Sequence, residues 1–269
     1  GHLPVFLGYV GQGMLDGCAV GNVFASPSAK KMADMIKACD HGSGVLCLYG
    51  NYGGDNMNFD MACEMVEMDD VETSSPKDTK EKRRGVAGMV YGFKVAGAAA
   101  ERMMSLDEVA AVAEKALDNI RTMGVALSPC IVPQVGEPTF KIGDDEIEIG
   151  MGIHGEKGIE VRKMMTADEG AKTLVVRITQ DMPLTQGDEV SVLVNGLGAT
   201  PMEEQLIVYR CVHELLTEKG VKIIMPHIGE YATSMEMAGL SVTIFKLDEQ
   251  LKELLTAPAK TPFYTNLNK

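Results

Sequence analysis

Apolar and polar positions along the chain change between strand-like and helical spacing, which predicts an α/β protein. Apolar or alternating runs typical of strands occupy residues 45–49, 146–149, 190–194, 221–224 and 241–245. Helical spacing occupies residues 57–67, 84–102 and 205–219, and Gly220 ends the last of these. A Ser105-to-Glu108 capping box predicts a further helix that runs to about Met123.

The pattern predicts two α/β domains that divide near Thr122. Residues 1–122 read as a domain with a mainly parallel sheet around the strand at 45–49, whose carboxyl end leads into a glycine-rich loop. Residues 123–269 contain the alternating strands of a more mixed sheet. The polar stretch at 73–82 reads as an exposed loop.

Composition narrows the classes of partner. The formal net charge of −13 over 269 residues argues against nucleic acid and against an anionic membrane surface. The six cysteines are scattered, without spacing for a metal site, and are typical of buried thiols in a reducing compartment. No apolar run approaches the ~20 residues of a membrane helix, so the cytoplasm is the expected location.

Three side chains are candidates for chemistry. His154 lies between glycines after a strand-like run, where its ring has little cover and could meet a small ligand, although a turn histidine without function fits equally well. Asp55 follows the run at 45–49, either as a carboxylate at the ligand edge of a sheet or as a turn former. His2 has no distinguishing context of its own.

Eight motifs that follow one another in register favour the functional interpretation of these three side chains. They are residues 1–4 (GHLP), 8–15 (GYVGQGML), 24–27 (FASP), 51–55 (NYGGD), 83–85 (RRG), 97–101 (GAAAE), 150–156 (GMGIHGE) and 195–201 (NGLGATP). The set closely resembles the dihydroxyacetone-binding (K) subunit of dihydroxyacetone kinases, from Gly1 to about Pro262. The resemblance implies a pair of α/β domains of the Dak1/DegV-like kind.

The resemblance also implies a chemistry. A nitrogen of the histidine that matches His154 adds to the carbonyl carbon of dihydroxyacetone and forms a covalent hemiaminal, which glycerol cannot form because it has no carbonyl group. The other two active residues match His2 and Asp55, with Asp55 accepting the proton of the hydroxyl that attacks phosphorus. Gly1 and Gly54 are the expected substrate-binding neighbours. The product would be dihydroxyacetone phosphate.

Nucleotide binding is expected on a partner. The sequence has no Gly-x-x-x-x-Gly-Lys-Ser/Thr loop, and no metal site is predicted in it. The resemblance implies that a separate nucleotide-binding L-type subunit carries ADP or ATP with magnesium, and that a phosphotransferase-system phosphocarrier acts on it indirectly. A homodimer of this chain is also implied.

Three departures from the family pattern leave alternatives open. Leu3 replaces a glutamate, Gly50 replaces a lysine, and Glu67 runs almost directly into Met68 where the family has a full strand. We expect residues to be missing at that junction and before Gly1, because deleting a central strand would exceed the stability of a domain. The alternatives are a dihydroxyacetone-sensing co-regulator of a transcription factor, and a kinase subunit for a larger ketose such as erythrulose.

Overall fold

The computed structural model describes residues 2–65, 84 and 86–267. Its helices are the 3-10 turn η1 (Leu7–Tyr9) and α1 (Ala29–Cys39), α2 (Gly53–Glu64), α3 (Met89–Glu101), α4 (Leu106–Asp118), α5 (Ala167–Asp181), α6 (Met202–Glu218) and α7 (Glu249–Thr256). Its strands are β1 (Ile120–Ser128), β2 (Glu146–Ile149), β3 (Glu160–Lys163), β4 (Glu189–Gly196), β5 (Lys222–Ile223), β6 (His227–Gly229), β7 (Ala238–Leu247), β8 (Ala259–Lys260) and β9 (Thr265–Asn266).

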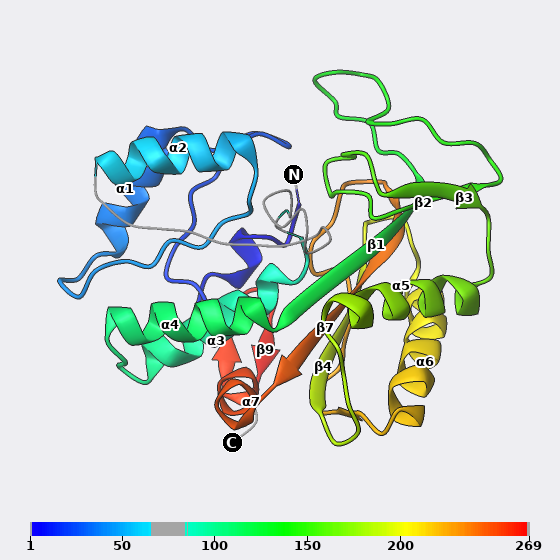
Figure 1. Cartoon of the computed structure of the whole chain (residues 1–269). Coiled ribbons are helices and arrows are strands. Elements are labelled where there is room, and N and C mark those ends of the chain that lie inside the picture. Colours follow the sequence, from blue (N-terminus) through cyan, green and yellow to red (C-terminus); the bar gives the residue numbers. More distant parts are fainter. Residues whose placement is uncertain (1, 66–83, 85, 268–269) are drawn as a thin grey trace.

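A mixed sheet forms the centre of the molecule (Figure 1). The strand order is β3-β2-β1-β7-β4-β5, and β6 also pairs with β4. The pairs along β3, β2, β1, β7 and β4 are antiparallel, whereas β5 and β6 run parallel to β4. The α/β fold and the mixed sheet predicted for the second half of the chain are therefore confirmed, as is the α6 helix that ends before Gly220.

Helices cover both faces of this sheet. On one face α5 and α6 pack on Val190, Val192, Val194 and Ile244, which alternate with residues that point the other way. On the other face α3, α4 and α7 pack on Leu193 and Phe245. The two helices α1 and α2 pack together on the N-terminal side, away from the sheet (Figure 1).

Local signals set the starts of two helices. The predicted capping box at Ser105 is present, with its side chain accepting from the Glu108 main-chain N–H and the Glu108 carboxylate accepting from the Ser105 main-chain N–H. A second box joins Thr166 and Glu169 at the start of α5. Each box satisfies main-chain donors that have no partner within the helix.

The helix predicted from Ser105 to Met123 is too long. It ends at Asp118, and residues 120–128 form strand β1, which pairs with β2 and β7. Ile120 and Thr122 are buried between these neighbours, and Thr122 hydrogen-bonds Thr243 across the sheet at 2.8 Å. Cross-strand pairing overrides the helical pattern here, and local spacing does not reveal it because the β7 partners lie more than 100 residues away in the sequence.

The strand predicted at residues 45–49 is not found among the described residues. The run is extended, and Cys47 and Tyr49 are buried against Met32, Ile36 and other side chains of α1 and α2, but no described strand pairs with it. The described part of residues 2–119 has helices and no strand, so the parallel sheet predicted for residues 1–122 is not found there. A parallel strand needs neighbours on its edges, and local sequence does not reveal whether they exist.

Two helix boundaries also differ. Helix α2 begins at Gly53, four residues earlier than predicted, and α3 begins at Met89 instead of residue 84. The loop at 73–82, the junction of Glu67 with Met68, and Gly1 lie outside the described residues. The division at about residue 122 stays a prediction. One core cluster contains residues from both sides of it.

Among the residues that the structure describes, no helix is both long enough and apolar enough to cross a bilayer.

A buried polar cluster ties α3 and the C-terminal segment to the sheet. His227 Nε2 lies 3.1 Å from the Tyr264 hydroxyl, and His227 Nδ1 lies 3.4 Å from the Tyr91 hydroxyl. Tyr91 in turn lies 2.7 Å from Ser191 Oγ on β4. Burial lowers the pKa of His227 to about 4, so this imidazole is neutral in the folded protein at neutral pH.

This burial predicts a loss of stability in mild acid. Unfolded His227 takes up a proton as the pH falls through 6.5, while the folded form stays neutral until the pH reaches about 4. The free energy of unfolding should therefore fall by about 3 kcal/mol between these values through this residue alone. Urea denaturation of the His227→Gln variant should show a flatter pH dependence, and the exposed His213→Gln should not. An unchanged slope in His227→Gln would contradict the assignment.

Candidate functional site

A cavity of about 1550 Å³ gathers most of the predicted site residues. His2, Gly54, Asp55 and His154 all contribute to its wall, although His2, helix α2 and His154 lie far apart in the sequence. Gly1 lies outside the described residues. The structure therefore brings together four of the five residues predicted from the sequence, and their roles stay predictions.

His154 lies in the tight turn after β2. Gly155 has a φ of +86°, a backbone conformation that favours glycine, and the turn is closed by a 3.0 Å hydrogen bond from the Gly155 N–H to the Gly152 carbonyl. The Glu156 carboxylate binds His154 twice, at the ring Nδ1 and at the main-chain N–H, each at 3.0 Å. A neutral imidazole carries a single N–H proton. When Nδ1 holds that proton and donates it to the carboxylate, Nε2 is unprotonated and has a free lone pair.

His2 lies edge-on to His154, with 4.5 Å between the ring centroids. Its Nδ1 donates to the Thr233 carbonyl at 2.6 Å, and its Nε2 is buried without a hydrogen-bond partner in the described part of the chain. Burial and the neighbouring His154 lower the pKa of His2 to about 3. The ring is therefore a neutral imidazole whose unpaired Nε2 can accept a hydrogen bond from a ligand hydroxyl.

Aromatic rings enclose both histidines. Phe24 stacks on His2 at a centroid distance of 4.4 Å and meets His154 edge-on at 5.3 Å. Tyr52 meets His154 edge-on from another side at 4.5 Å. Phe24 has a φ of +53°, which is strained for a phenylalanine and is typical of backbone held in place at a functional site.

Asp55 lies in the first turn of α2, not in the loop that the sequence predicted. Burial raises the pKa of its carboxyl, and a hydrogen bond with the Ser26 side chain and the nearby His154 act in the opposite direction. Gly54 makes room for Ser26, because a Cβ at this position would lie 2.8 Å from Ser26 Oγ. A half-buried carboxylate with a raised pKa is suited to accept a proton near neutral pH.

One loop positions both histidines. The Thr233 carbonyl accepts from His2, and the neighbouring Ser234 hydroxyl donates at 2.5 Å to the Ile153 carbonyl, immediately before His154. The buried Asn195 at the end of β4 holds this loop: its Oδ1 accepts the main-chain N–H groups of Tyr231 and Ala232, and its Nδ2 donates to the Ala232 carbonyl.

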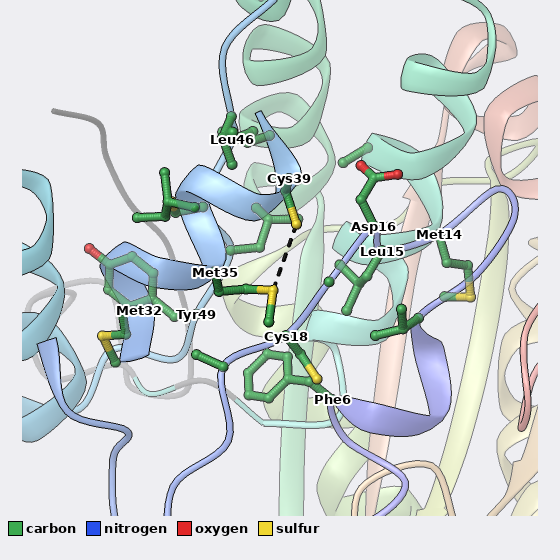
Figure 2. Close-up of a pocket in the computed structure, with 18 of the residues that line it drawn as sticks. Phe6, Met14, Leu15, Asp16, Cys18, Met32, Met35, Cys39, Leu46 and Tyr49 are labelled. Atoms are coloured by element: carbon green, nitrogen blue, oxygen red, sulfur yellow. Dashed lines mark hydrogen bonds between the residues drawn. The ribbon is translucent and has the colours of Figure 1, made fainter. Parts of the chain in front are cut away.

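The cavity continues well beyond these polar groups. Figure 2 shows its other part, between η1, α1 and the run at 45–49, where the wall is formed largely by apolar and sulfur-containing side chains. They include Phe6, Met14, Leu15, Cys18, Met32, Met35, Cys39 and Leu46. Such a surface offers few partners for sugar hydroxyls, so the total volume does not by itself select a larger ketose.

Comparison with known proteins assigns the family. The Dak1 domain model matches residues 1–263 of the chain. This chain belongs to the Dak1 family. The resemblance stated from the eight motifs is thereby confirmed.

Two curated relatives in the Dak1 family have different substrates in their names. The dihydroxyacetone-binding subunit DhaK of PTS-dependent dihydroxyacetone kinase 1 of Listeria innocua is 47% identical, over 97% of this chain and 83% of the relative. The L-erythrulose kinase of Pectobacterium atrosepticum is 42% identical, over 98% of this chain and 47% of that longer protein.

Solved structures confirm the fold. The dihydroxyacetone kinase operon co-activator Dha-DhaQ superposes with a TM-score of 0.91 at 30% identity, over 99% of this chain and 86% of that one. The dihydroxyacetone kinase of C. freundii in complex with AMP-PNP and Mg2+ gives 0.90 at 31% identity, over 99% of this chain and 50% of that one. A DegV lipid-binding protein of Thermotoga maritima, with a TM-score of 0.55 at 10% identity, shares the fold alone.

Several site residues were not identified from the sequence. Phe24, Tyr52 and Glu156 lie inside motifs that carried the resemblance, yet nothing in their spacing indicated contact with a histidine. Thr233 and Ser234 lie in a segment without any motif, and their contacts arise from the fold.

The Ser26 contact predicts the direction in which the Asp55 pKa should move. The hydrogen bond from Ser26 stabilises the ionised carboxylate, so Ser26→Ala should raise the pKa of Asp55 further. The carboxyl carbon signal of Asp55 in a pH titration by NMR measures this, with Asp55→Asn identifying the signal. Ser28→Ala, at the cap of α1, is the matched control and should leave the signal unmoved. A pKa that stays constant or falls in Ser26→Ala would contradict the contact.

Proposed function

We propose that this protein is the substrate-binding subunit of a dihydroxyacetone kinase. It holds dihydroxyacetone as a covalent hemiaminal on His154 while a partner transfers a phosphoryl group to a primary hydroxyl. The observation that carries the proposal is the arrangement of His154 in the cavity wall, with Nδ1 bound to a carboxylate, beside the neutral His2 and near the half-buried Asp55. The Dak1 membership and the names of the relatives support it.

The three side chains have distinct roles in this proposal. His154 Nε2 is the nucleophile that adds to the carbonyl carbon. His2 Nε2, which has no hydrogen-bond partner among the residues that the structure describes, accepts a hydrogen bond from the bound substrate. Asp55 accepts the proton of the terminal hydroxyl as that oxygen attacks phosphorus, a task that the raised pKa of its carboxyl favours.

The phosphoryl donor belongs to the partner. The C. freundii kinase binds AMP-PNP and Mg2+ and is about twice as long as the part this chain matches, which supports nucleotide and magnesium on a separate L-type subunit or domain. The phosphotransferase-system dependence in the names of the Listeria relatives supports a phosphocarrier as the indirect donor. We also propose that the protein forms a homodimer. We further propose a cytoplasmic location, because its six free cysteines are typical of a reducing compartment.

We also propose the division of the chain into two α/β domains at about residue 122. The run at 45–49 packs Cys47 and Tyr49 on α1 and α2, and among the described residues no strand pairs with it.

Covalent capture can be tested by native intact-mass spectrometry. The wild-type protein mixed with dihydroxyacetone should gain the mass of one triose, because His154 adds to the carbonyl group. His154→Ala should gain nothing, whereas the exposed His213→Ala should behave as the wild type. Glycerol should give no adduct with any of the three proteins. An adduct that survives in His154→Ala would reject this residue as the site of capture.

A second function has specific support. The co-activator Dha-DhaQ superposes on this chain as well as the kinase does. In addition, Leu3 and Gly50 replace two charged residues of the family pattern. Both observations favour a sensing co-regulator that binds triose without phosphorylating it. The erythrulose kinases among the relatives similarly favour a tetrose substrate.

A coupled assay with an L-type subunit separates these functions. The kinase proposal expects phosphorylated product from the wild type and at least a hundredfold less from Asp55→Asn, because the attacking hydroxyl then lacks its base. Exposed Asp60→Asn, on the same helix, should retain full activity. Triose binding without product would indicate the sensor, and a higher kcat/KM with erythrulose than with dihydroxyacetone would indicate a tetrose kinase.

A further inference from the structure

The Glu156 carboxylate makes two hydrogen bonds with His154. Oε1 lies 3.0 Å from His154 Nδ1, and Oε2 accepts the His154 main-chain N–H at 3.0 Å. The same carboxylate therefore fixes the ring and the backbone that carries it. Both side chains are about a quarter exposed, and His154 lines the cavity.

The turn is built around this carboxylate. The Gly152 N–H donates to the Glu156 carbonyl at 3.0 Å, which places residue 156 back over residue 152. A Cβ on Gly152 would lie only 2.0 Å from Glu156 Oε2. The absence of a side chain at position 152 is thus a requirement for the carboxylate to lie where it does.

The charge state follows from these contacts. Burial of the Glu156 carboxyl raises its pKa, but the hydrogen bonds from His154 more than offset this, and the pKa lies below its usual value. The group is ionised at neutral pH and acts as an acceptor only, so the ring nitrogen that faces it bears a proton. The lone pair of the neutral ring is then on Nε2.

We propose that Glu156 is a positioning residue that holds His154 in the Nδ1–H tautomer and so presents Nε2 as the nucleophile toward a ketose carbonyl. This rests on the proposed function. The Nε2 lone pair forms the N–C bond, the carbonyl π pair moves to the oxygen, and a water molecule protonates that oxygen. Positive charge develops on the ring beside the Glu156 carboxylate, which accepts the Nδ1 proton and returns it to the hydroxide. The overall addition is neutral.

The arrangement also orients the ring. Phe24, Tyr52 and His2 all meet His154 at close to right angles, so rotation of the imidazole about its bond to the Cβ would collide with one of them. Aromatic packing limits the plane of the ring, and the carboxylate decides which nitrogen faces away from the turn. Neither contact alone defines both the plane and the tautomer.

Two variants remove the contact in different ways. Glu156→Gln keeps the size of the side chain, but its amide places an N–H group opposite one of the two donors of His154 and has no charge. Gly152→Ala keeps Glu156 and displaces its carboxylate through the added Cβ. Glu137→Gln, in an exposed loop, is the matched control. Thermal unfolding and circular dichroism establish that each variant is folded.

The decisive measurement is ¹⁵N NMR of His154, which distinguishes the tautomers, together with the triose concentration that gives half-maximal adduct by intact mass. Wild type and Glu137→Gln should show the Nδ1–H form. Glu156→Gln and Gly152→Ala should show mixed tautomers and need at least tenfold more triose. Folded Glu156→Gln with the wild-type tautomer and unchanged capture would overturn the inference.

The outcomes also separate this inference from the proposed function. If the wild type forms no adduct but the tautomer still changes in Glu156→Gln, the positioning of the ring stands and dihydroxyacetone capture is rejected. If the wild type forms the adduct and Glu156→Gln forms it equally well, capture stands and the role of Glu156 is rejected.

Discussion

The side-chain amide of Asn195 is the contact on which the site depends. It is buried at the end of β4, and it binds the main chain of residues 231 and 232 through both its oxygen and its nitrogen. Those bonds fix the loop whose next two residues hold His2 and the backbone before His154. A buried amide with its hydrogen bonds made is costly to disturb, because any displacement leaves polar groups unpaired. The central sheet thereby determines the separation of two histidines that are 152 positions apart in the sequence.

The two histidine rings are held by the same kind of hydrogen bond. Each has its Nδ1 against an oxygen acceptor, the Thr233 carbonyl for His2 and the Glu156 carboxylate for His154. In the neutral rings both Nε2 atoms therefore carry lone pairs. Their environments differ in charge, since His2 faces a neutral carbonyl and His154 faces an ionised group. The ring beside the carboxylate is the one that can tolerate positive charge as a bond forms at its Nε2, whereas burial keeps the other neutral.

Predictions from the sequence succeeded where the cause is local. The Ser105 capping box needs only residues within one turn, and the glycine requirement around His154 is a matter of backbone φ at Gly155. Predictions from the sequence failed where the secondary structure depends on pairing with a segment far away in the chain. The segment after Asp118 continues a helical pattern, yet it pairs with β7 across more than 100 residues and becomes β1. The run at 45–49 has the composition of a buried strand but no described strand neighbour, and Asp55 lies in the first turn of α2 because that helix begins at Gly53.

The sequence by itself determined the family, the identity of the candidate residues and the mixed α/β character, because motif order and hydrophobic spacing are properties of the chain. Only the tertiary structure decided which groups surround them. The stacking of Phe24 on His2, the contact of Tyr52 with His154 and the support from Thr233 and Ser234 join segments that no spacing connects. Even Glu156, two residues from His154, takes its position from a turn whose closure depends on the conformation of Gly152 and Gly155. Reactivity at such a site depends on directions and distances between side chains, and these are fixed only when the sheet and its loops are packed.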